Sequence, residues 1–470
     1  MSFISANNYK HLESDSAMIQ AAVDEATKIH GIAVIPGFNE RTGESKWTIT
    51  KAIRLHTGSS VCLEGCHIVQ AEGVFQNIFT NSNFGTPAAY TKEGTQSDIH
   101  IYGVGGVLLD GGNPVTELTE ATHSKNGLPH VTQNSMFNFI NVERIKIENI
   151  NIKNQRYWAF VFHYCTHGKV SGINFNVSNV YHNQDGIDLR TGCSDFIIEN
   201  ISGVTGDDVV ALTCLRSIYD NDMDPAFDTS INSVIIRNVH ARTNYSLVRL
   251  LNHYGKKIYN ILIDGVMEDI EREPSKEQNS ENIQENKRIV RTGATVRIGE
   301  NVYYRDDMYA KLGDTYNITV KNVTSRGRMG VRAACTLSDS VIENVKMYAN
   351  GGAAVYFGEG EYKNVTVKDV MYPAGVVARK TDDNRQEGNW NSSVFPADPE
   401  REVCAMYFKG AKAGNLIVQN VVAGENLTAV FGAMDDSKVE MRAANIIRHS
   451  TDTPVTKGDG LDIKFMNEVI

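Results

Sequence analysis

The chain has 470 residues and a formal net charge of −10. Its basic residues are scattered without a long run of Lys or Arg, which argues against nucleic acid or an anionic membrane as a main partner. No apolar stretch approaches the roughly 18 residues that a membrane-spanning helix requires, so no membrane span is predicted.

The N-terminal residues and the cysteines bear on the compartment. Residues 1–10 contain no basic segment followed by an apolar core, so they do not resemble a signal peptide. The chain has seven cysteines, an odd number without the density of a small disulfide-rich domain, which fits reduced thiols. These observations predict a cytoplasmic protein, unless an export signal has been removed.

An amphipathic helix is predicted over about residues 15–30. Asp15 or Ser16 can cap its start and Gly31 its end, and its apolar residues recur at helical spacing: Met18, Ile19, Ala22, Val23, Ala26 and Ile29. The open end of a β-solenoid exposes strand edges and apolar core, so a helix there is expected to cap it.

A short pattern of alternating apolar residues, closed by Asn, Asp or Gly and one more apolar residue, recurs along the chain. Alternation turns one face of a strand inward, while Asn, Asp and Gly tolerate the left-handed conformation of a tight turn. Stacked Asn side chains can also form hydrogen-bonded ladders. The pattern predicts an all-β parallel β-helix of about ten or more coils. Its eight copies are residues 145–150, 196–201, 234–239, 261–266, 318–323, 340–345, 365–370 and 416–421.

The chain is predicted to be a single β-helix domain over residues 1–470. Three segments interrupt the repeat and are expected to be inserted loops, at about 214–230, 267–292 and 374–402. Such loops commonly wall a substrate groove or mediate subunit contact, which leaves a homo-oligomer open.

Two acidic motifs stand one repeat apart. They are Asn183-Gln184-Asp185 and Gly206-Asp207-Asp208, so that Asp207 and Asp208 follow Asp185 by 22 and 23 residues. A coil of a parallel β-helix has about this length, and neighbouring coils stack at about 4.8 Å. The three carboxyl groups are therefore expected to lie together. Crowded carboxylates disfavour one another's ionisation, so this arrangement points to function.

The two motifs and their flanks resemble glycoside hydrolase family 28, the polygalacturonases and rhamnogalacturonases. That family carries Asn-Thr-Asp and Gly-Asp-Asp on successive coils of a right-handed parallel β-helix. The resemblance covers roughly residues 12–370 and is strongest at 136–214. It implies a right-handed parallel β-helix with an N-terminal capping helix. The matching flanks are His182, Gly186-Ile187-Asp188 and Val209-Val210-Ala211-Leu212.

The resemblance also implies roles for the site residues. Asp207 would be the general acid, while Asp185 and Asp208 would hold and activate the attacking water, giving inversion at the anomeric carbon. Glycoside cleavage needs one protonated and one ionised carboxyl group, and crowding is expected to raise the pKa of at least one of them. Asn183 and His182 would contact the substrate.

Two family features are altered downstream. Where the family carries Gly-His-Gly, this chain has Asn244-Tyr245-Ser246, and His253 or His240 could replace the missing histidine. The family also carries Arg-Ile-Lys, which binds a substrate carboxylate. This chain has Arg297-Ile298-Gly299 there, so the arginine is present and the lysine is missing. An arginine suits bidentate carboxylate binding. The changes argue against ordinary polygalacturonase specificity, and we take Tyr245, His253 and Arg297 as substrate-binding candidates.

No metal or cofactor is predicted. Residues 220–224 resemble the start of a calcium loop, but Pro225 stands where the loop needs glycine and Ile231 where it needs a bidentate Glu. His163 could line the groove, although a packed histidine on the solenoid is the favoured interpretation.

The leading hypothesis is an inverting, exo-acting glycoside hydrolase that cleaves plant-polysaccharide-derived, pectin-like oligosaccharides. A β-helix lyase, epimerase or fructotransferase would keep the site and change the reaction. A non-catalytic carbohydrate-binding solenoid, such as a phage tail adhesin, is the other alternative. In each case the expected partner is an oligosaccharide.

Overall fold

The structure, a computed structural model, describes most of the chain. It covers residues 2–112, 134–177, 183–243, 245–253, 255–269, 293–300, 309–327, 329–348, 352–373, 403–425, 427–434, 436–467 and 469. By internal contacts the chain forms two compact units, residues 1–235 and 236–470, and each is described by itself. One continuous domain stays a prediction.

The first unit consists of parallel strands arranged in two sheets, with short helical segments η1 (Ala6–Tyr9) and η2 (Pro87–Tyr90). One sheet contains β4 (Ile53–Leu55), β7 (Phe79–Asn81), β10 (Phe137–Ile140), β12 (Phe160–His163), β14 (Ile187–Arg190) and β16 (Val210–Cys214). The other contains β1 (Phe3–Ser5), β2 (Ile32–Pro36), β3 (Trp47–Ile49), β5 (Ser60–Glu64), β6 (His67–Gln70), β8 (Gln96–Val104), β9 (Leu108–Asp110), β11 (Val142–Lys153), β13 (Lys169–Asn176) and β15 (Ser194–Val204). The unit boundary falls within β17 (Ile231–Arg242).

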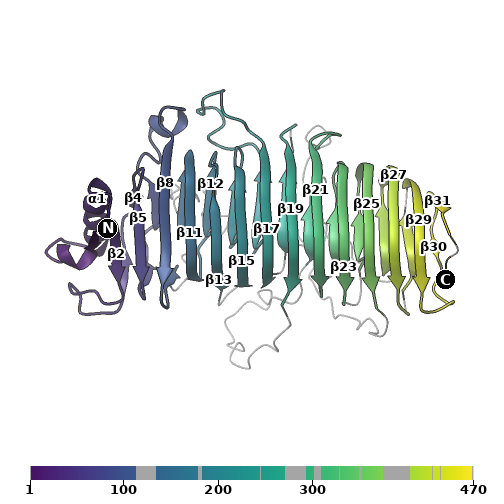
Figure 1. Cartoon of the computed structure of the whole chain (residues 1–470), viewed down its shortest axis with the longest axis horizontal. Helices are drawn as coiled ribbons and strands as arrows, with labels where there is room; N and C mark the ends of the chain where they lie inside the picture. The colour runs from purple at the N-terminus through teal and green to yellow at the C-terminus, as the bar shows by residue number, and fades with distance from the viewer. Residues whose placement is uncertain are drawn as a thin grey trace. The chain divides into compact units, whose positions relative to one another are not determined.

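The second unit repeats this arrangement. Its first set of parallel strands is β18 (Ser246–Asn252), β20 (Ala294–Ile298), β22 (Met329–Ala333), β24 (Val355–Phe357), β26 (Cys404–Lys409), β28 (Ala429–Met434) and β30 (Thr456–Lys457). Its second set is β19 (Ile258–Glu268), β21 (Thr315–Ser325), β23 (Leu337–Met347), β25 (Gly360–Tyr372), β27 (Ala411–Ala423), β29 (Lys438–Arg448) and β31 (Leu461–Phe465). The fold is the predicted right-handed parallel β-helix (Figure 1).

The eight sequence repeats fall on the long strands, as the alternating pattern predicts. In β21, for example, Ile318, Val320 and Val323 are buried. Asn322 follows the alternating run with a φ of 59°, the left-handed conformation that asparagine tolerates. The expected ladder also forms, because Asn344 Nδ2 donates to Asn322 Oδ1 at 2.6 Å and Asn322 Nδ2 donates to Asp264 Oδ1 at 2.7 Å.

The predicted N-terminal helix is α1 (Asp15–Lys28), which lies beside β2 in Figure 1. Five of the predicted apolar residues are buried, as expected of a cap: Met18, Ile19, Ala22, Val23 and Ala26. The helix ends two residues earlier than predicted, and Ile29 lies beyond it with 42 % of its surface exposed. The N-cap is Ser14, and neither Asp15 nor Ser16 has this role. Ser14 Oγ accepts a hydrogen bond from the Ala17 N–H at 3.2 Å.

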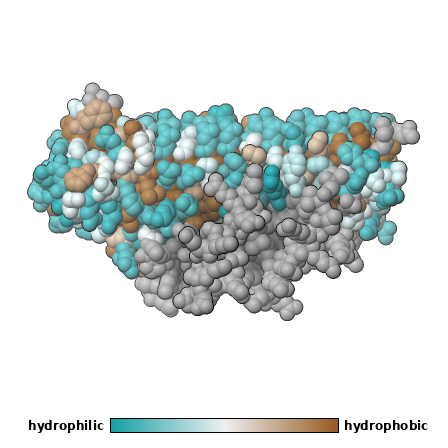
Figure 2. Space-filling view, turned by 90° about the horizontal axis from the view of Figure 1, so that it is seen from below, coloured by the Kyte–Doolittle hydropathy of each residue, from teal (hydrophilic) through white to brown (hydrophobic). Residues whose placement is uncertain are grey.

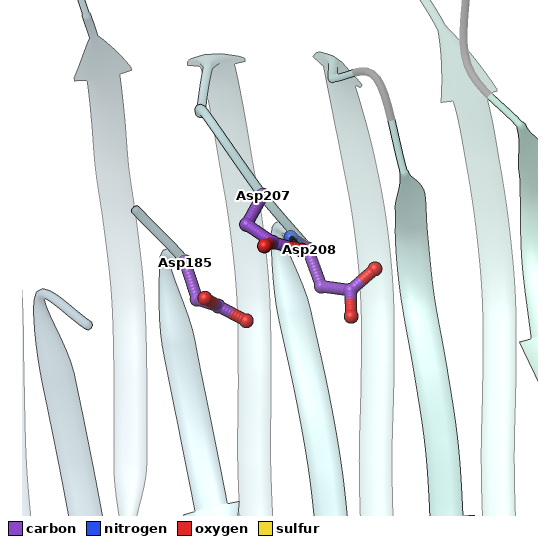
Figure 3. A group of neighbouring side chains, drawn as sticks. All are labelled: Asp185, Asp207 and Asp208. Atoms are coloured by element: carbon purple, nitrogen blue, oxygen red, sulfur yellow. Dashed lines mark hydrogen bonds between the residues drawn. The ribbon is translucent and has the colours of Figure 1, made fainter. Parts of the chain in front are cut away.

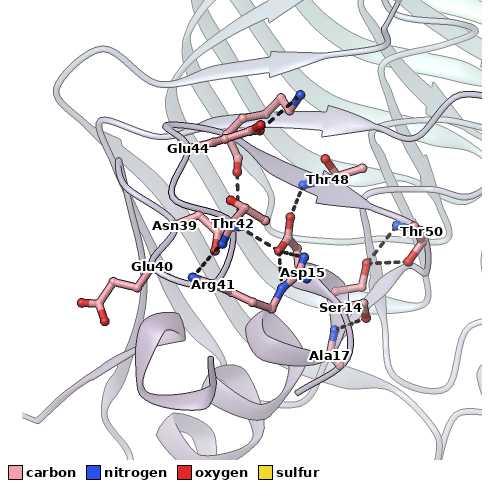
Figure 4. A network of polar contacts seen from close by, with 12 residues as sticks. Ser14, Asp15, Ala17, Asn39, Glu40, Arg41, Thr42, Glu44, Thr48 and Thr50 are labelled. Atoms are coloured by element: carbon pink, nitrogen blue, oxygen red, sulfur yellow. Dashed lines mark hydrogen bonds and ion pairs between the residues drawn. The ribbon is translucent and has the colours of Figure 1, made fainter. Parts of the chain in front are cut away.

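Asp15 is thereby free for a different task (Figure 4). Its carboxylate is buried and accepts hydrogen bonds from Arg41 Nη2 at 2.6 Å, Asn39 Nδ2 at 2.8 Å and the Thr48 N–H at 2.7 Å. A buried carboxylate without partners would lower the stability of the fold. These hydrogen bonds instead connect the start of α1 to residues 39–48, which follow β2.

The predicted insertions are only partly within the described residues. Residues 215–230 contain no strand and join β16 to β17, as expected for an inserted loop. Residues 267 and 268 were predicted to begin the second inserted loop, but they are the last two residues of strand β19. The Glu268 side chain is buried and continues the alternation of the strand. Residues 270–292 and 374–402 lie outside the described residues.

The described surface is mostly polar. In Figure 2, hydrophilic residues cover much of the visible face, with apolar patches between them. No described helix combines the length and apolar character that a membrane crossing requires. All seven cysteines lie within the described residues and are buried, and none of them forms a disulfide bond there.

Candidate active site

The two acidic motifs stand directly before neighbouring strands of the first unit. Asp185 comes two residues before β14, and Asp207 and Asp208 come shortly before β16. The backbone places them side by side, because the Gly186 N–H donates to the carbonyl of Asp208 at 2.9 Å. A side chain at Gly186 would meet the Val209 carbonyl at 2.4 Å, so only glycine permits this approach.

The predicted convergence of the three carboxyl groups is present (Figure 3). One oxygen from each of Asp185, Asp207 and Asp208 lies within 4.8 Å of the other two. Asp185 and Asp208 are buried, and Asp208 exposes only 1 % of its surface, while Asp207 is half-buried. The negative charges of three carboxylates this close repel one another.

Backbone donors hold Asp207 in place. Its Oδ2 accepts the N–H of Asn183 at 2.9 Å, and its Oδ1 accepts the N–H of Asp208 at 2.9 Å. Asn183 turns its N–H toward Asp207 because it adopts a φ of 61°. Such donors favour the charged carboxylate, whereas the neighbouring carboxylates disfavour it. Proton donation by Asp207 therefore requires that crowding outweigh the two N–H groups.

A buried amide pair fixes the same turn to the preceding coil. Gln184 Nε2 donates to the Gln155 carbonyl at 2.8 Å, and Gln155 Nε2 donates to the Gln184 carbonyl at 3.1 Å. The Gln184 carbonyl also accepts the N–H of Asp207 at 3.3 Å. Both glutamines are fully buried. The position of the aspartates is therefore set by polar contacts between coils as well as by strand pairing.

The structure adds neighbours that the sequence did not single out as site residues. Tyr157 and Trp158 precede β12, with ring centroids 4.6 Å apart, and the guanidinium carbon of Arg190 lies 4.6 Å from the Trp158 ring centroid. The alternation in β14 was a usable signal. Ile187 and Leu189 face the core, so Asp188 and Arg190 must share the opposite face.

The pKa of Tyr157 is shifted by the charged residues around it. Burial raises the pKa of Tyr157, and the negative charges of Asp185, Asp188 and Asp207 raise it further, whereas the positive charge of Arg190 opposes them. Tyr157 is therefore a neutral hydroxyl at neutral pH.

His163 is a packed histidine, which was the favoured interpretation. It exposes 3 % of its surface and meets the Tyr219 ring edge-on, with centroids 4.9 Å apart. Burial, and to a lesser degree the nearby charge of Arg190, lower the pKa of His163 to about 3. This imidazole is therefore uncharged at neutral pH.

The neutral state of His163 predicts a loss of stability in acid. An unfolded histidine takes up a proton near pH 6.5, whereas folded His163 does so only near pH 3. Between pH 6.5 and pH 3 the unfolded state therefore binds more protons than the folded state. As the pH falls through this range, proton uptake by His163 in the unfolded chain lowers the free energy of unfolding. We expect wild type to lose about 2 kcal/mol more than His163→Phe between pH 6.5 and 5. Urea denaturation at both pH values measures this.

Phe162→Leu on the same strand, β12, provides a control, because it changes buried packing without altering a titratable group and should leave the pH dependence of wild type unchanged. Equal slopes for wild type and His163→Phe would show that His163 takes up its proton in the folded state as easily as in the unfolded chain.

The remaining substrate-binding candidates divide by position. His182 lies outside the described residues, whereas Asn183 belongs to the aspartate group through its contact with Asp207. Tyr245, His253 and Arg297 lie in the second unit, and all three are buried. The carbonyl of Tyr245 accepts the N–H groups of Gly293 and Ala294, at 3.0 and 3.2 Å, which holds it at the start of β20.

Arg297 belongs to a buried charged group within the second unit. It pairs in register with Arg249 on β18 and Arg332 on β22. Glu300 Oε2 lies 3.5 Å from Arg297 Nη1 and 2.5 Å from Arg332 Nη1. Burial raises the pKa of Glu300, but the charges of Arg332, Arg297 and Arg249 lower it by more, so the carboxylate stays ionised.

The same aspartate cluster has the composition of a cation site. Within the described ranges, Asp185, Asp207 and Asp208 form the one group of three or more His, Cys, Asp or Glu side chains close enough to share a metal ion. In the 220–224 loop, Asp220 accepts the Tyr164 hydroxyl at 2.8 Å and Asp224 accepts the Ala226 N–H at 2.8 Å. Acidic clusters also serve proton transfer, so the geometry alone assigns no metal.

Comparisons with known proteins agree with this picture. Residues 49–250, which contain all three aspartates, match the model of glycosyl hydrolases family 28. No curated protein sequence matches the chain.

Solved structures share the fold at low identity. An exopolygalacturonase from Thermotoga maritima is 13% identical, with a TM-score of 0.52 over 80% of this chain and 87% of that one. The tailspike of E. coli bacteriophage HK620 is 13% identical, with a TM-score of 0.55 over 98% and 78%. The endo-xylogalacturonan hydrolase of Aspergillus tubingensis is 12% identical, with a TM-score of 0.50 over 98% and 99%. The chain thus matches the model of glycosyl hydrolases family 28 over residues 49–250, and this match supports a glycoside hydrolase.

Proposed function

We propose that this protein hydrolyses short, pectin-like oligosaccharides from one end, with inversion at the anomeric carbon. The observation that carries the proposal is the group of Asp185, Asp207 and Asp208, whose oxygens lie within 4.8 Å of one another inside the segment that matches the family. One protonated and one ionised carboxyl group are the minimum that glycoside cleavage requires.

The division of roles follows the family resemblance. Asp207 donates the proton to the glycosidic oxygen, because it is the most exposed of the three and can reach a substrate from the surface. Asp185 and Asp208 hold the water that attacks the anomeric carbon. Their burial favours a fixed water position, since few other partners compete for it.

The separation of the carboxyl groups bears on the stereochemistry of the reaction. Acid and base carboxyl groups are usually about 6.5–9.5 Å apart in inverting glycosidases and about 5–5.5 Å apart in retaining ones. The aspartate oxygens here are closer than the inverting range. In the proposal Asp185 and Asp208 together hold the attacking water, while Asp207 protonates the glycosidic oxygen, and the configuration of the product decides between inversion and retention.

The substrate is expected to differ from unsubstituted polygalacturonate. Gly299 replaces the lysine that the family uses for a second carboxylate, and Tyr245 replaces its histidine. One missing charge-assisted hydrogen bond costs about 1.5–3 kcal/mol, or one to two decades of affinity. We therefore expect turnover of galacturonate or rhamnose-containing oligosaccharides to exceed turnover of the polymer by about tenfold or more.

A side-by-side assay tests the proposal. Polygalacturonate, galacturonate oligomers and neutral oligosaccharides are incubated with the protein, and NMR follows the anomeric proton of the first product. A single terminal sugar released with inverted configuration supports the proposal. Random cleavage of the polymer contradicts the exo action, and retained configuration contradicts the mechanism.

Two other outcomes identify the alternatives. An unsaturated product with no uptake of water would indicate a lyase. Tight oligosaccharide binding without any turnover would indicate a carbohydrate-binding solenoid. The cytoplasmic location stays a prediction.

A further inference from the structure

Arg190 lies in the first unit, beside the aspartates, in a position the family motifs do not assign. It is the last residue of β14, on the face that also carries Asp188. The indole of Trp158 is the guide to where its side chain goes. Trp158 directly precedes Ala159, whose N–H donates to the carbonyl of Asp185 at 3.0 Å, so Trp158 flanks Asp185 one coil earlier.

The Arg190 side chain reaches back along this face. Its guanidinium carbon lies 4.6 Å from the Trp158 ring centroid, so the charge sits toward the aspartate end of β14. The tyrosine beside Trp158 responds both to Arg190 and to Asp185, Asp188 and Asp207. The cation and the acidic cluster therefore share one environment.

Two contacts hold the guanidinium in a fixed orientation. It stacks on Trp158, and its Nη1 donates to Thr213 Oγ1 at 2.5 Å, from the residue that pairs with Arg190 in register on β16. Stacking on an aromatic face and a directed hydrogen bond both reduce the rotamer freedom of an arginine. The side chain is half-buried, so it remains within reach of a ligand.

Among the described residues, the Arg190 guanidinium contacts Trp158 and Thr213, and neither is a carboxylate. Within the part of the chain that the structure describes, Arg190 forms no ion pair, although Asp188 stands two residues away on the same face. A guanidinium has five N–H donors, and one of them is used by Thr213. The buried His163 nearby is uncharged and adds no second positive charge.

We propose that Arg190 is a specificity-determining residue that binds the carboxylate of a uronic acid residue next to the bond that is cleaved. The inference rests on the proposed function and deepens it, since it names an acidic sugar as the substrate class. An anionic sugar approaching three aspartates is repelled, and a fixed cation beside them offsets that repulsion. A neutral sugar would have no such need.

The fork of a guanidinium matches a carboxylate, with two parallel N–H···O hydrogen bonds. Arg190 is half-buried and Thr213 uses one of its N–H groups, so the other N–H groups are available for such a partner. A lysine could supply the charge but neither the fork nor the planar stack.

The test compares a uronide with its own methyl ester, which has the same shape without the charge. The probes are trigalacturonic acid and its trimethyl ester, and the variants are Arg190→Gln and Arg190→Lys. We expect Arg190→Gln to lower the acid-to-ester ratio of kcat/KM by about 10- to 100-fold, mainly through KM. Arg190→Lys should lower it by about three- to tenfold, because the charge remains without the fork.

Arg144→Gln is the matched control. Arg144 is exposed on β11, in the other sheet of the first unit, and pairs with Asp98. Its substitution should leave the acid-to-ester ratio unchanged. If Arg190→Gln lowered kcat/KM equally for the acid and the ester, Arg190 would support the aspartates and would not bind the substrate carboxylate, which would overturn the inference. So would a wild-type protein that does not prefer the acid.

Calorimetric titration of both probes into Asp207→Asn protein, with and without Arg190→Gln, separates this inference from the proposed function. Acid-selective binding that requires Arg190 supports the inference even if wild type cleaves neither probe, which would contradict only the proposed function. If Arg190→Gln does not fold, Thr213→Val keeps the test open, because loss of its hydrogen bond should reduce acid selectivity in the same direction.

Discussion

Replacing Asp207 with asparagine is expected to reduce glycosidase turnover by at least about 10²–10⁴-fold on a substrate with an unactivated leaving group, because asparagine cannot supply the proton. On an activated aryl glycoside, whose leaving group needs little protonation, the loss should be much smaller. Asp185→Asn and Asp208→Asn should instead lose activity on both substrates, since they impair the attacking water.

The fold should survive the Asp207→Asn change. The asparagine oxygen can accept one of the two N–H groups that now bind Asp207, from Asn183 and Asp208, and the other loses its partner. This costs about 1–3 kcal/mol, which is less than the usual stability of a domain. Thermal unfolding verifies that the variant is folded.

Asp195→Asn is the matched control for this experiment. Asp195 is exposed on β15, in the other sheet, and its φ of 57° suits asparagine. Its turnover should equal that of wild type. Normal turnover of the unactivated substrate by Asp207→Asn would remove Asp207 from the mechanism.

Arg156→Met is expected to lower the free energy of unfolding by about 3–5 kcal/mol. Arg156 exposes 2 % of its surface and directly precedes Tyr157 and Trp158. It donates to backbone carbonyls of other segments: Gly111 at 2.6 Å, Val74 at 2.6 Å, Ala71 at 2.8 Å and Gln70 at 2.9 Å. Methionine fills a similar volume but removes all four hydrogen bonds, of which the two to Gly111 and Gln70 are buried.

Burial lowers the pKa of Arg156 to about 10, so it stays charged at neutral pH and its hydrogen bonds are charge-assisted. Urea denaturation followed by circular dichroism measures the loss. Arg54→Met is the control, because exposed Arg54 also donates to two carbonyls, those of Ser82 and Phe84. It should cost less than about 1 kcal/mol. Equal losses in both variants would mean that burial adds nothing to the Arg156 contacts.

The sequence predicted those features that depend on local pattern. The alternating residues of 318–323 and its relatives require one inward face, and the closing asparagines require a left-handed turn. Coil length then determines which residues become neighbours. The spacing of 22 and 23 residues between Asp185 and the pair Asp207 and Asp208 was sufficient to bring their carboxyl groups together.

Local pattern was less decisive where two residues could serve equally well. Asp15 was a reasonable N-cap, yet Ser14 caps α1 because Asp15 is drawn into contacts with Arg41 and Asn39. Those partners are about 25 residues away in the chain, and no rule for helix ends takes them into account.

Only the tertiary structure decided how long side chains cross between coils. Arg190 extends back over Trp158, and Arg156 binds carbonyls more than 80 residues earlier in the chain. Strand register fixes where a Cα lies, but a flexible arginine can end anywhere within its reach. Its final place depends on the aromatic faces and carbonyls that loops of irregular length bring near it, and a repeat pattern does not encode those lengths.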